Sequence, residues 1–143
     1  MSWLEPKQQW QSTDIFYLED WNRITGNARY LYDVLDATFE WKECILEDTA
    51  AIPYYDIINN LEKNLYNLSQ VVSYINIEFV ATTWHPRTSE NYTHNPSYLD
   101  FNRWERFEHK LRFATVQLTN LYSGNFNAGS NRTRQSLGRC NTL

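Results

Sequence analysis

"DWNRITGNARYL", residues 20–31, is the stretch that decides the fold, because two variants of it follow along the chain. They are "NNLEKNLYNL", residues 59–68, and "DFNRWERFEHKL", residues 100–111. Alignment on the asparagines places Asn22, Asn59 and Asn102 in register, and Ile24, Leu61 and Trp104 follow two positions later. A local pattern written three times indicates one structural unit that is used three times.

Apolar residues in and around each stretch recur every three or four positions, which is the period of a helix with one buried face. The three apolar stripes are Trp21, Ile24, Ala28, Leu31, Leu35 and Thr38; then Ile57, Leu61, Leu65, Leu68, Val72 and Ile75; then Phe101, Trp104, Phe107, Leu111, Ala114, Leu118 and Leu121. Residues 75–80 are the one short candidate strand, and they fit a helix end equally well. The predicted fold class is therefore all-α.

We predict three long helices at about residues 17–38, 54–75 and 98–122, related as repeats and packed antiparallel or crossed in a small bundle. With the segments that lead into them, the repeat-like units span 3–38, 48–75 and 84–122. Together they form a helical body at 1–123 with an extended N-terminal lead. From residue 124 onward the chain has three glycines, three arginines and no acid, which predicts an extended basic C-terminal tail at 124–143.

Several start signals support these helices. Acids stand in the opening turns, where unpaired backbone N–H groups and the positive end of the helix dipole stabilise negative charge; they are Glu19, Asp20, Asp56 and Asp100. Ser97 and Asp100 have the spacing of a capping box. "WLEPK" at 3–7 and "WHPR" at 84–87 precede the outer copies, so the repeated unit includes a non-helical lead with a tryptophan, a proline and a base.

The Asn-Arg pairs, Asn22-Arg23 and Asn102-Arg103, come one turn into their helices. An amide there can bond a neighbouring loop, and a guanidinium can fork onto a carboxylate or onto carbonyl oxygens. The pairs either tie each lead to its helix, or they place Arg23 and Arg103 against a partner subunit.

The sequence gives little support for an enzyme. His85, His94 and His109 are scattered without metal-ligand spacing, and no HExxH, GxSxG or phosphate-binding loop occurs. We therefore expect no catalytic residues, no metal and no cofactor. Cys44 and Cys140 lie far apart without CxxC spacing, so we expect free thiols.

Charge and hydropathy limit the partners. A formal net charge of -4 argues against specific nucleic-acid binding and against an anionic membrane surface. No apolar run approaches the roughly 18 residues of a membrane span, and the first residues lack the pattern of a secretory signal. We expect a chain that is made in a cytoplasm and has no membrane span.

Aromatic residues make up 16% of the chain, and this excess is a hint of joined surfaces. Those outside the helix stripes include Trp3, Trp10, Trp41, Trp84, Tyr92 and Tyr98. They could form the core under loops, dock on neighbouring subunits, or stack against sugars. The tail arginines could clasp an acidic neighbour. As candidate partner-binding residues we select Trp3, Trp10, Arg23, Trp84, Arg103, Arg132, Arg134 and Arg139.

Residues 3–35 resemble a module of small structural proteins in bacteriophages and prophages of Gram-positive bacteria. In that module a Trp-x-x-Pro-Lys lead precedes a helix start of the form Asp-x-Asn-Arg-Ile-Glu-x-Asn. The matching residues are Trp3, Pro6, Lys7, Trp10, Asp14, Asp20, Asn22, Arg23, Ile24 and Asn27, whereas Thr25 replaces the glutamate. The third repeat restores the acid as Glu105 but has Trp104 for the aliphatic residue and Phe107 for the second asparagine.

The resemblance implies a non-enzymatic structural subunit of a phage tail, baseplate or tail-fibre region. Its expected partners are copies of itself and other tail proteins, and its expected location is the virion after assembly in the host bacterial cytoplasm. An alternative is a carbohydrate-binding module on the same virion that recognises host surface glycans through exposed Trp84 and Tyr92.

Overall fold

A computed structural model of the chain describes residues 2–46, 55–86 and 96–128, and these ranges are all-helical apart from their connections. The elements are α1 (Leu18–Val34), α2 (Tyr55–Val71), the short 3-10 helix η1 (Ser73–Ile75) and α3 (Tyr98–Ala128). The described ranges contain no strand, so the predicted all-α class with three long helices is confirmed and residues 75–80 are not a strand. No helix in these ranges is long and apolar enough to cross a membrane.

The chain divides into two compact units, Met1–Lys110 and Leu111–Leu143. The first unit holds α1, α2, η1 and the beginning of α3, and everything described below as a bundle belongs to it. Of the second unit the structure describes the remainder of α3, which continues as helix to Ala128.

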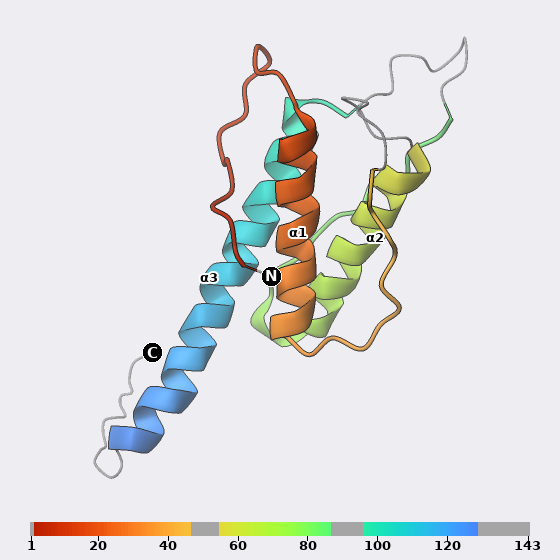
Figure 1. Cartoon of the computed structure of the whole chain (residues 1–143). Helices are drawn as coiled ribbons and strands as arrows, with labels where there is room; N and C mark the ends of the chain where they lie inside the picture. The colour runs from red at the N-terminus through yellow and green to blue at the C-terminus, as the bar shows by residue number, and fades with distance from the viewer. Residues whose placement is uncertain (1, 47–54, 87–95, 129–143) are drawn as a thin grey trace. The chain divides into compact units, whose positions relative to one another are not determined.

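The three helices of the first unit run in the same direction, and an extended segment returns along the bundle before the next helix begins (Figure 1). Arg23 near the start of α1 lies 2.8 Å from Glu105 near the start of α3. Arg103 of α3 lies 2.6 Å from Glu62 in the first half of α2. These contacts near the helix starts agree with the common direction of the helices, so the predicted antiparallel packing is wrong.

The core of the first unit forms where the apolar stripes of the helices meet. Fully buried stripe residues are Trp21, Ile24, Ala28 and Leu31 on α1, Leu61, Leu65 and Leu68 on α2, and Trp104 on α3. The indoles of Trp21 and Trp104 meet edge to face with 6.0 Å between ring centroids. The predicted stripes are therefore confirmed at these positions. Ile58 and Thr115 are buried rather than the predicted Ile57 and Ala114, and Thr38 is exposed. The side chains of Leu118 and Leu121 lie outside the described residues.

The helix starts follow the predicted signals. Asp20 accepts a hydrogen bond from the Tyr17 N–H at 2.8 Å, and Asp100 accepts one from the Ser97 N–H at 2.9 Å. The Ser97 hydroxyl in turn accepts from the Leu99 N–H at 3.3 Å. These bonds use backbone donors that an α-helix cannot satisfy internally. The predicted capping role of Ser97 and Asp100 is confirmed.

The helix ends differ from the prediction. α1 stops at Val34 instead of residue 38, because Asp36 turns into the left-handed region with φ 52. The Ala37 N–H then bonds the Tyr32 carbonyl at 3.0 Å, and the Asp36 N–H bonds the Asp33 carbonyl at 3.2 Å. This pair of bonds is a Schellman motif, which closes a helix whose next residue has positive φ.

The ends of α2 and α3 also differ from the predicted ends. α2 ends at Val71 and the predicted last turn is the 3-10 helix η1, after which Asn76 has φ 61. α3 extends beyond residue 122 to Ala128, so the first residues assigned to the tail are helical. A single glycine at 124 costs about 1 kcal/mol relative to alanine, which does not by itself end a helix. The rest of the predicted tail, residues 129–143, lies outside the described residues.

Asp36 offers a test of how α1 ends. Glycine adopts positive φ without the steric penalty of a side chain, so Asp36→Gly should raise the free energy of unfolding by about 0.5–1 kcal/mol. Thermal and denaturant unfolding followed by circular dichroism would measure the change. Asp33→Gly, which places the glycine inside α1, should destabilise the fold instead. A destabilised Asp36→Gly variant would show that the Asp36 side chain, and not its backbone angle, matters at this position.

Candidate functional site

Three extended lead segments, residues 2–16, 37–46 and 76–86, lie against the helices, and asparagine side chains hold them there. In each case one amide accepts from the N–H and donates to the C=O of the same extended residue, an arrangement that we call an asparagine clamp. The clamps are Asn27 on Leu4 (3.0 and 2.7 Å), Asn102 on Trp10 (2.7 and 3.0 Å), Asn64 on Lys42 (3.0 and 2.7 Å) and Asn59 on Trp84 (2.8 and 2.8 Å).

The clamps solve a bonding problem. An extended residue carries one backbone donor and one backbone acceptor, and both need partners when they leave water. A neighbouring strand would supply them in a sheet, whereas here the carboxamide of asparagine supplies both. Each clamp therefore replaces a sheet contact by a helix side chain and fixes one point of a lead segment on one helix.

The first lead segment runs between α1 and α3, where it is held by the buried carboxylate of Glu105. Arg23 of α1 binds this carboxylate with both arms of its fork, at 2.8 and 2.9 Å. The Trp10 indole N–H donates to it at 2.6 Å, and the Lys7 backbone N–H donates at 3.2 Å. Arg23 also reaches Asp20 at 2.9 Å. One carboxylate thus joins two helices and the lead segment.

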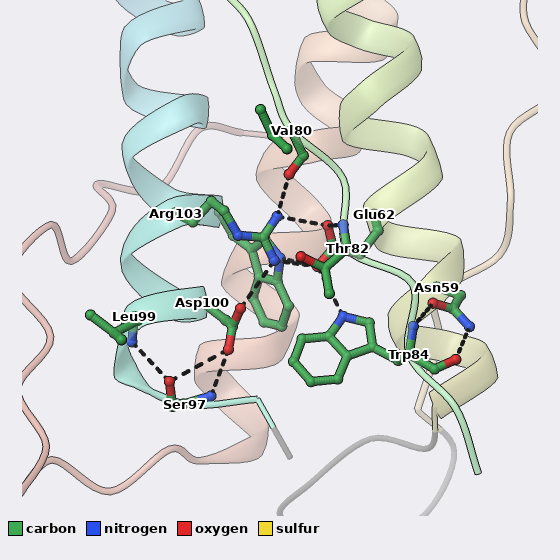
Figure 2. A network of polar contacts seen from close by, with 10 residues as sticks. Asn59, Glu62, Val80, Thr82, Trp84, Ser97, Leu99, Asp100 and Arg103 are labelled. Carbon is green, nitrogen blue, oxygen red and sulfur yellow. Dashed lines mark hydrogen bonds and ion pairs between the residues drawn. The ribbon is translucent and has the colours of Figure 1, made fainter. Parts of the chain in front are cut away.

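The third lead segment repeats this plan between α3 and α2, with Glu62 as the carboxylate (Figure 2). Arg103 of α3 binds both oxygens of Glu62, at 2.8 and 2.6 Å. The Trp84 indole donates to Glu62 at 3.0 Å and the Thr82 N–H donates at 3.1 Å. Arg103 also bonds Asp100 at 3.1 Å. The indole of Trp104, which is equivalent to Ile24 in α1, adds a further donor to Glu62 at 2.9 Å.

Burial and charge reinforce the two networks. Glu105 has no exposed side-chain surface and Glu62 has 2%. The hydrogen bonds and negative charge of Glu105 raise the pKa of Arg23, outweighing its partial burial. Burial by itself lowers the pKa of Arg103, but the bonds and charges of Glu62 and Asp100 outweigh it and raise the pKa. Both arginines therefore stay charged, and removal of either would leave a buried carboxylate without its counter-charge.

The second lead segment lies between α2 and α1. The Trp21 indole donates to the Cys44 carbonyl at 2.9 Å, and Asn60 donates to the Glu43 carbonyl at 2.8 Å. Cys44 is a free, buried cysteine, as predicted, and burial raises the pKa of its thiol to about 12. A thiol with this pKa is an inert core group rather than a nucleophile. Cys140 lies outside the described residues.

A third buried carboxyl, that of Glu108, differs from Glu62 and Glu105. It is fully buried, and neither of its oxygens has a hydrogen-bond partner. Burial first, and then the charge of Glu105, raise the pKa of Glu108 well above the usual value, although Arg23 opposes the shift. Glu108 is therefore protonated over a range in which an exposed glutamate is ionised. Within the described ranges no group of three or more His, Cys, Asp or Glu residues could hold a metal ion.

The structure places the predicted site residues as follows. Trp10 and Trp84 are buried, and Arg23 and Arg103 bind carboxylates within the chain. The hypothesis that each Asn-Arg pair ties its lead to its own helix holds only for Arg103, which donates to the Val80 carbonyl of the lead before α3 at 2.9 Å. Asn102 holds the lead that precedes α1 instead, and the Asn22 side chain is exposed. Trp3 packs beside Tyr30 with 5.7 Å between ring centroids. Contacts of these residues with a partner stay a prediction. Arg132, Arg134, Arg139 and Tyr92 lie outside the described residues.

Two parts of the site were missed in the sequence. Glu62 and Glu105 follow their clamp asparagines by three positions, and this Asn-x-x-Glu spacing, absent from α1, was the available signal. The lead segments were also misaligned, because the sequence pairs Trp3 with Trp84. In the structure Trp10 is the equivalent of Trp84, since both give backbone groups to an asparagine and an indole N–H to a glutamate.

Comparisons with known proteins gave no match to a protein-family model, to a curated protein or to a solved structure. We therefore describe the class of protein from its fold and its candidate site alone. It is an all-α bundle of parallel helices whose grooves hold extended chain through asparagine clamps and buried arginine-glutamate pairs.

The repeat supplies a matched pair of variants for the clamp. Asn102→Ala should lower the free energy of unfolding by about 2–4 kcal/mol, since it leaves the N–H and C=O of Trp10 buried without partners. Asn22→Ala removes the same side chain at the same register, but Asn22 is exposed, so the change should stay within about 0.5 kcal/mol. Denaturant unfolding would measure both. Equal losses for the two variants would contradict the clamp interpretation.

The raised pKa of the buried Glu108 carboxyl predicts that the stability of the fold depends on pH. Above about pH 4.3 the unfolded chain ionises this residue while the folded chain keeps its proton, so the folded state binds more protons. The free energy of unfolding should therefore fall as pH rises, by about 1.4 kcal/mol per pH unit, until the folded pKa is reached.

Glu108→Gln removes this contribution, so its stability relative to wild type should grow across the same pH range. Chemical unfolding between pH 4 and 8 would measure the difference. Glu78→Gln, at an exposed glutamate, is the control and should show no such trend. A constant difference between Glu108→Gln and wild type would mean that Glu108 is ionised in the folded chain.

Proposed function

We propose that this chain is a non-enzymatic structural subunit of a bacteriophage tail or baseplate, which joins neighbouring subunits and helps to attach fibres. The resemblance of residues 3–35 to a module of phage structural proteins supports the virion setting. The matched residues of that module include Trp10, Asn22, Arg23 and Asn27. Three of these four form clamp or carboxylate contacts, so the resemblance covers the residues that organise the bundle.

The observation that carries the proposal is the way in which the helices hold extended chain. Both backbone groups of Trp10 and of Trp84 are bound by side chains of a helix, and their indoles fill the groove. The same contacts serve equally well when the extended segment belongs to a neighbouring subunit. A virion component needs such contacts, because repeated subunits multiply a modest contact into a stable assembly.

The glycan-binding alternative depended on exposed Trp84 and Tyr92. Trp84 has 9% of its surface exposed, and its indole N–H is bound to Glu62. A ring that stacks on a sugar must present a free face, so the position of Trp84 favours the assembly function over the glycan alternative.

A virion experiment tests the proposal. Particles produced by the phage or prophage that encodes this chain should contain it at a fixed ratio to the other tail proteins, and high-salt washing should not remove it. Deletion of the gene should yield particles with missing or malformed tails in electron micrographs, and the wild-type gene supplied in trans should restore them. Mass spectrometry of the purified particles measures the ratio.

Two results would decide against the proposal. Normal tailed particles without the chain would exclude a structural role. Particles of normal shape that no longer adsorb to host cells would favour the glycan-binding alternative instead.

A further inference from the structure

The buried carboxyl of Glu108 stands in a layer of the core that is apolar in the other two repeats. In the alignment of the repeats, Glu108 of α3 is equivalent to Ala28 of α1 and Leu65 of α2. All three residues are fully buried. Neither oxygen of Glu108 has a hydrogen-bond partner among the described residues. Buried polar groups are nearly always hydrogen-bonded, so this exception needs a physical explanation.

The neighbourhood of Glu108 is the main difference between the two carboxylate networks. Each network has a buried glutamate that binds both arms of an arginine fork and an indole N–H. Glu105 is followed three positions later by Glu108, whereas Glu62 is followed three positions later by Leu65. Residues three positions apart are neighbours on a helix surface. The first network therefore has a second carboxyl beside it, and the second network has an apolar side chain in that place.

The charges that act on Glu108 belong to the first network. They are the negative charge of Glu105 on the same helix and the positive charge of Arg23 on α1. Arg112, four positions further along α3, is not among the charges that shift the pKa of Glu108. Arg23 is therefore the cation that Glu108 shares with Glu105.

The other elements at this level present uncharged groups. α2 has Leu65 at the equivalent position. The second lead segment has the thiol of Cys44, which feels the charge of Glu108 and is neutral because burial raises its pKa to about 12. The third lead segment has Phe79, whose ring centroid lies 5.1 Å from that of Phe107.

Glu108 cannot lose its proton without a change in its surroundings, because an ionised carboxylate without hydrogen-bond donors is costly to bury. Two sources of donors exist, namely Arg23 and water. Arg23 already donates three N–H groups to Glu105 and Asp20, so a turn toward Glu108 weakens its hold on Glu105. Glu105 has no exposed side-chain surface, and with less of its counter-charge it needs water as well.

The first lead segment covers this part of the groove between α1 and α3. Its residue Leu4 is clamped by Asn27, and Asn27 is equivalent to Phe107, the residue before Glu108. The lead segment therefore passes the level of Glu108. Water can reach the two carboxyl groups if this segment leaves the groove, and the helices can stay packed.

The bonds that hold the first lead segment end on the affected carboxylate. The Trp10 indole N–H and the Lys7 backbone N–H both donate to Glu105. In the second network Trp84 and Thr82 donate in the same way to Glu62, which has no carboxyl at the following turn. Ionisation of Glu108 therefore acts on the first lead segment and not on the third.

We propose that Glu108 is a proton-controlled switch for the N-terminal lead segment. With its proton, Glu108 leaves Arg23 to Glu105 and the lead segment is held in its groove. Without its proton, Glu108 competes for Arg23, and the lead segment leaves the groove while the helices stay packed. The inference goes beyond the proposed function and does not depend on it.

The direction of the pH dependence follows from linkage. Glu108 has a raised pKa while the lead segment is held, and a lower pKa once water reaches it. Low pH therefore favours the held form. As pH rises between the two pKa values, the ratio of released to held lead segment should grow by up to about tenfold per pH unit.

Fluorine NMR of the full-length chain labelled with 5-fluorotryptophan tests the switch. The chain has six tryptophans, and the variants Trp10→Phe and Trp84→Phe identify the two signals of interest. Between about pH 5 and 9 the Trp10 signal should move to the position of a water-exposed tryptophan. The Trp84 signal should stay in place, and circular dichroism should show that the helices are retained.

Glu108→Gln keeps a neutral side chain of the same shape, so the Trp10 signal should stay at the position of the held form across the whole pH range. Glu108→Leu introduces the residue that α2 has at this position and should give the same result, which guards against a carboxamide that the core does not accept. Glu78→Gln, at an exposed glutamate, is the control and should respond to pH like the wild type.

Three results would overturn the inference. The first is a Trp10 signal that does not move with pH in the wild type. The second is movement of the Trp10 and Trp84 signals together with loss of the helical circular dichroism, which would mean that the whole fold opens. The third is a Trp10 signal that still moves in both Glu108→Gln and Glu108→Leu, which would assign the pH dependence to another group.

Discussion

The rest of this structure depends on one constraint. The backbone N–H and C=O groups of its extended lead segments need hydrogen-bond partners, and no neighbouring strand supplies them within the described residues. Parallel helices require return segments, and these segments lie on the bundle with their peptide groups partly removed from water. The amides of Asn27, Asn59, Asn64 and Asn102 meet that need one residue at a time. Because each clamp also fixes a point of a lead segment on a particular helix, the same side chains determine where the segments run.

The buried carboxylates add specificity to this arrangement. A buried ion pair seldom adds much stability over a well-packed apolar group, because both charges lose their hydration. Its geometry is demanding, however, and Glu105 accepts bonds that only one neighbour and one lead segment can supply together. Glu62 imposes the same demand on α3 and the third lead segment. The pairs therefore fix the order of the helices.

Local signals in the sequence predicted much of this fold. The helical period identified Ile24, Leu61 and Trp104 as equivalent core positions, and the capping role of Ser97 and Asp100 follows from spacing alone. The end of α1 was not predicted, because it depends on the positive φ of Asp36, a residue whose type only weakly favours that conformation. The direction of the helices was also missed, since apolar periodicity is the same for parallel and antiparallel packing.

The sequence by itself determined that this protein has three related helices, where they begin and which residues face inward, because these properties depend on neighbours within a few positions. The tertiary structure decided which lead segment lies in which groove, that Trp10 rather than Trp3 matches Trp84, and that Arg23 binds a carboxylate 82 positions away. These arrangements depend on which hydrogen bonds between residues far apart in the sequence can form at the same time. A pattern of neighbouring residues does not contain that information.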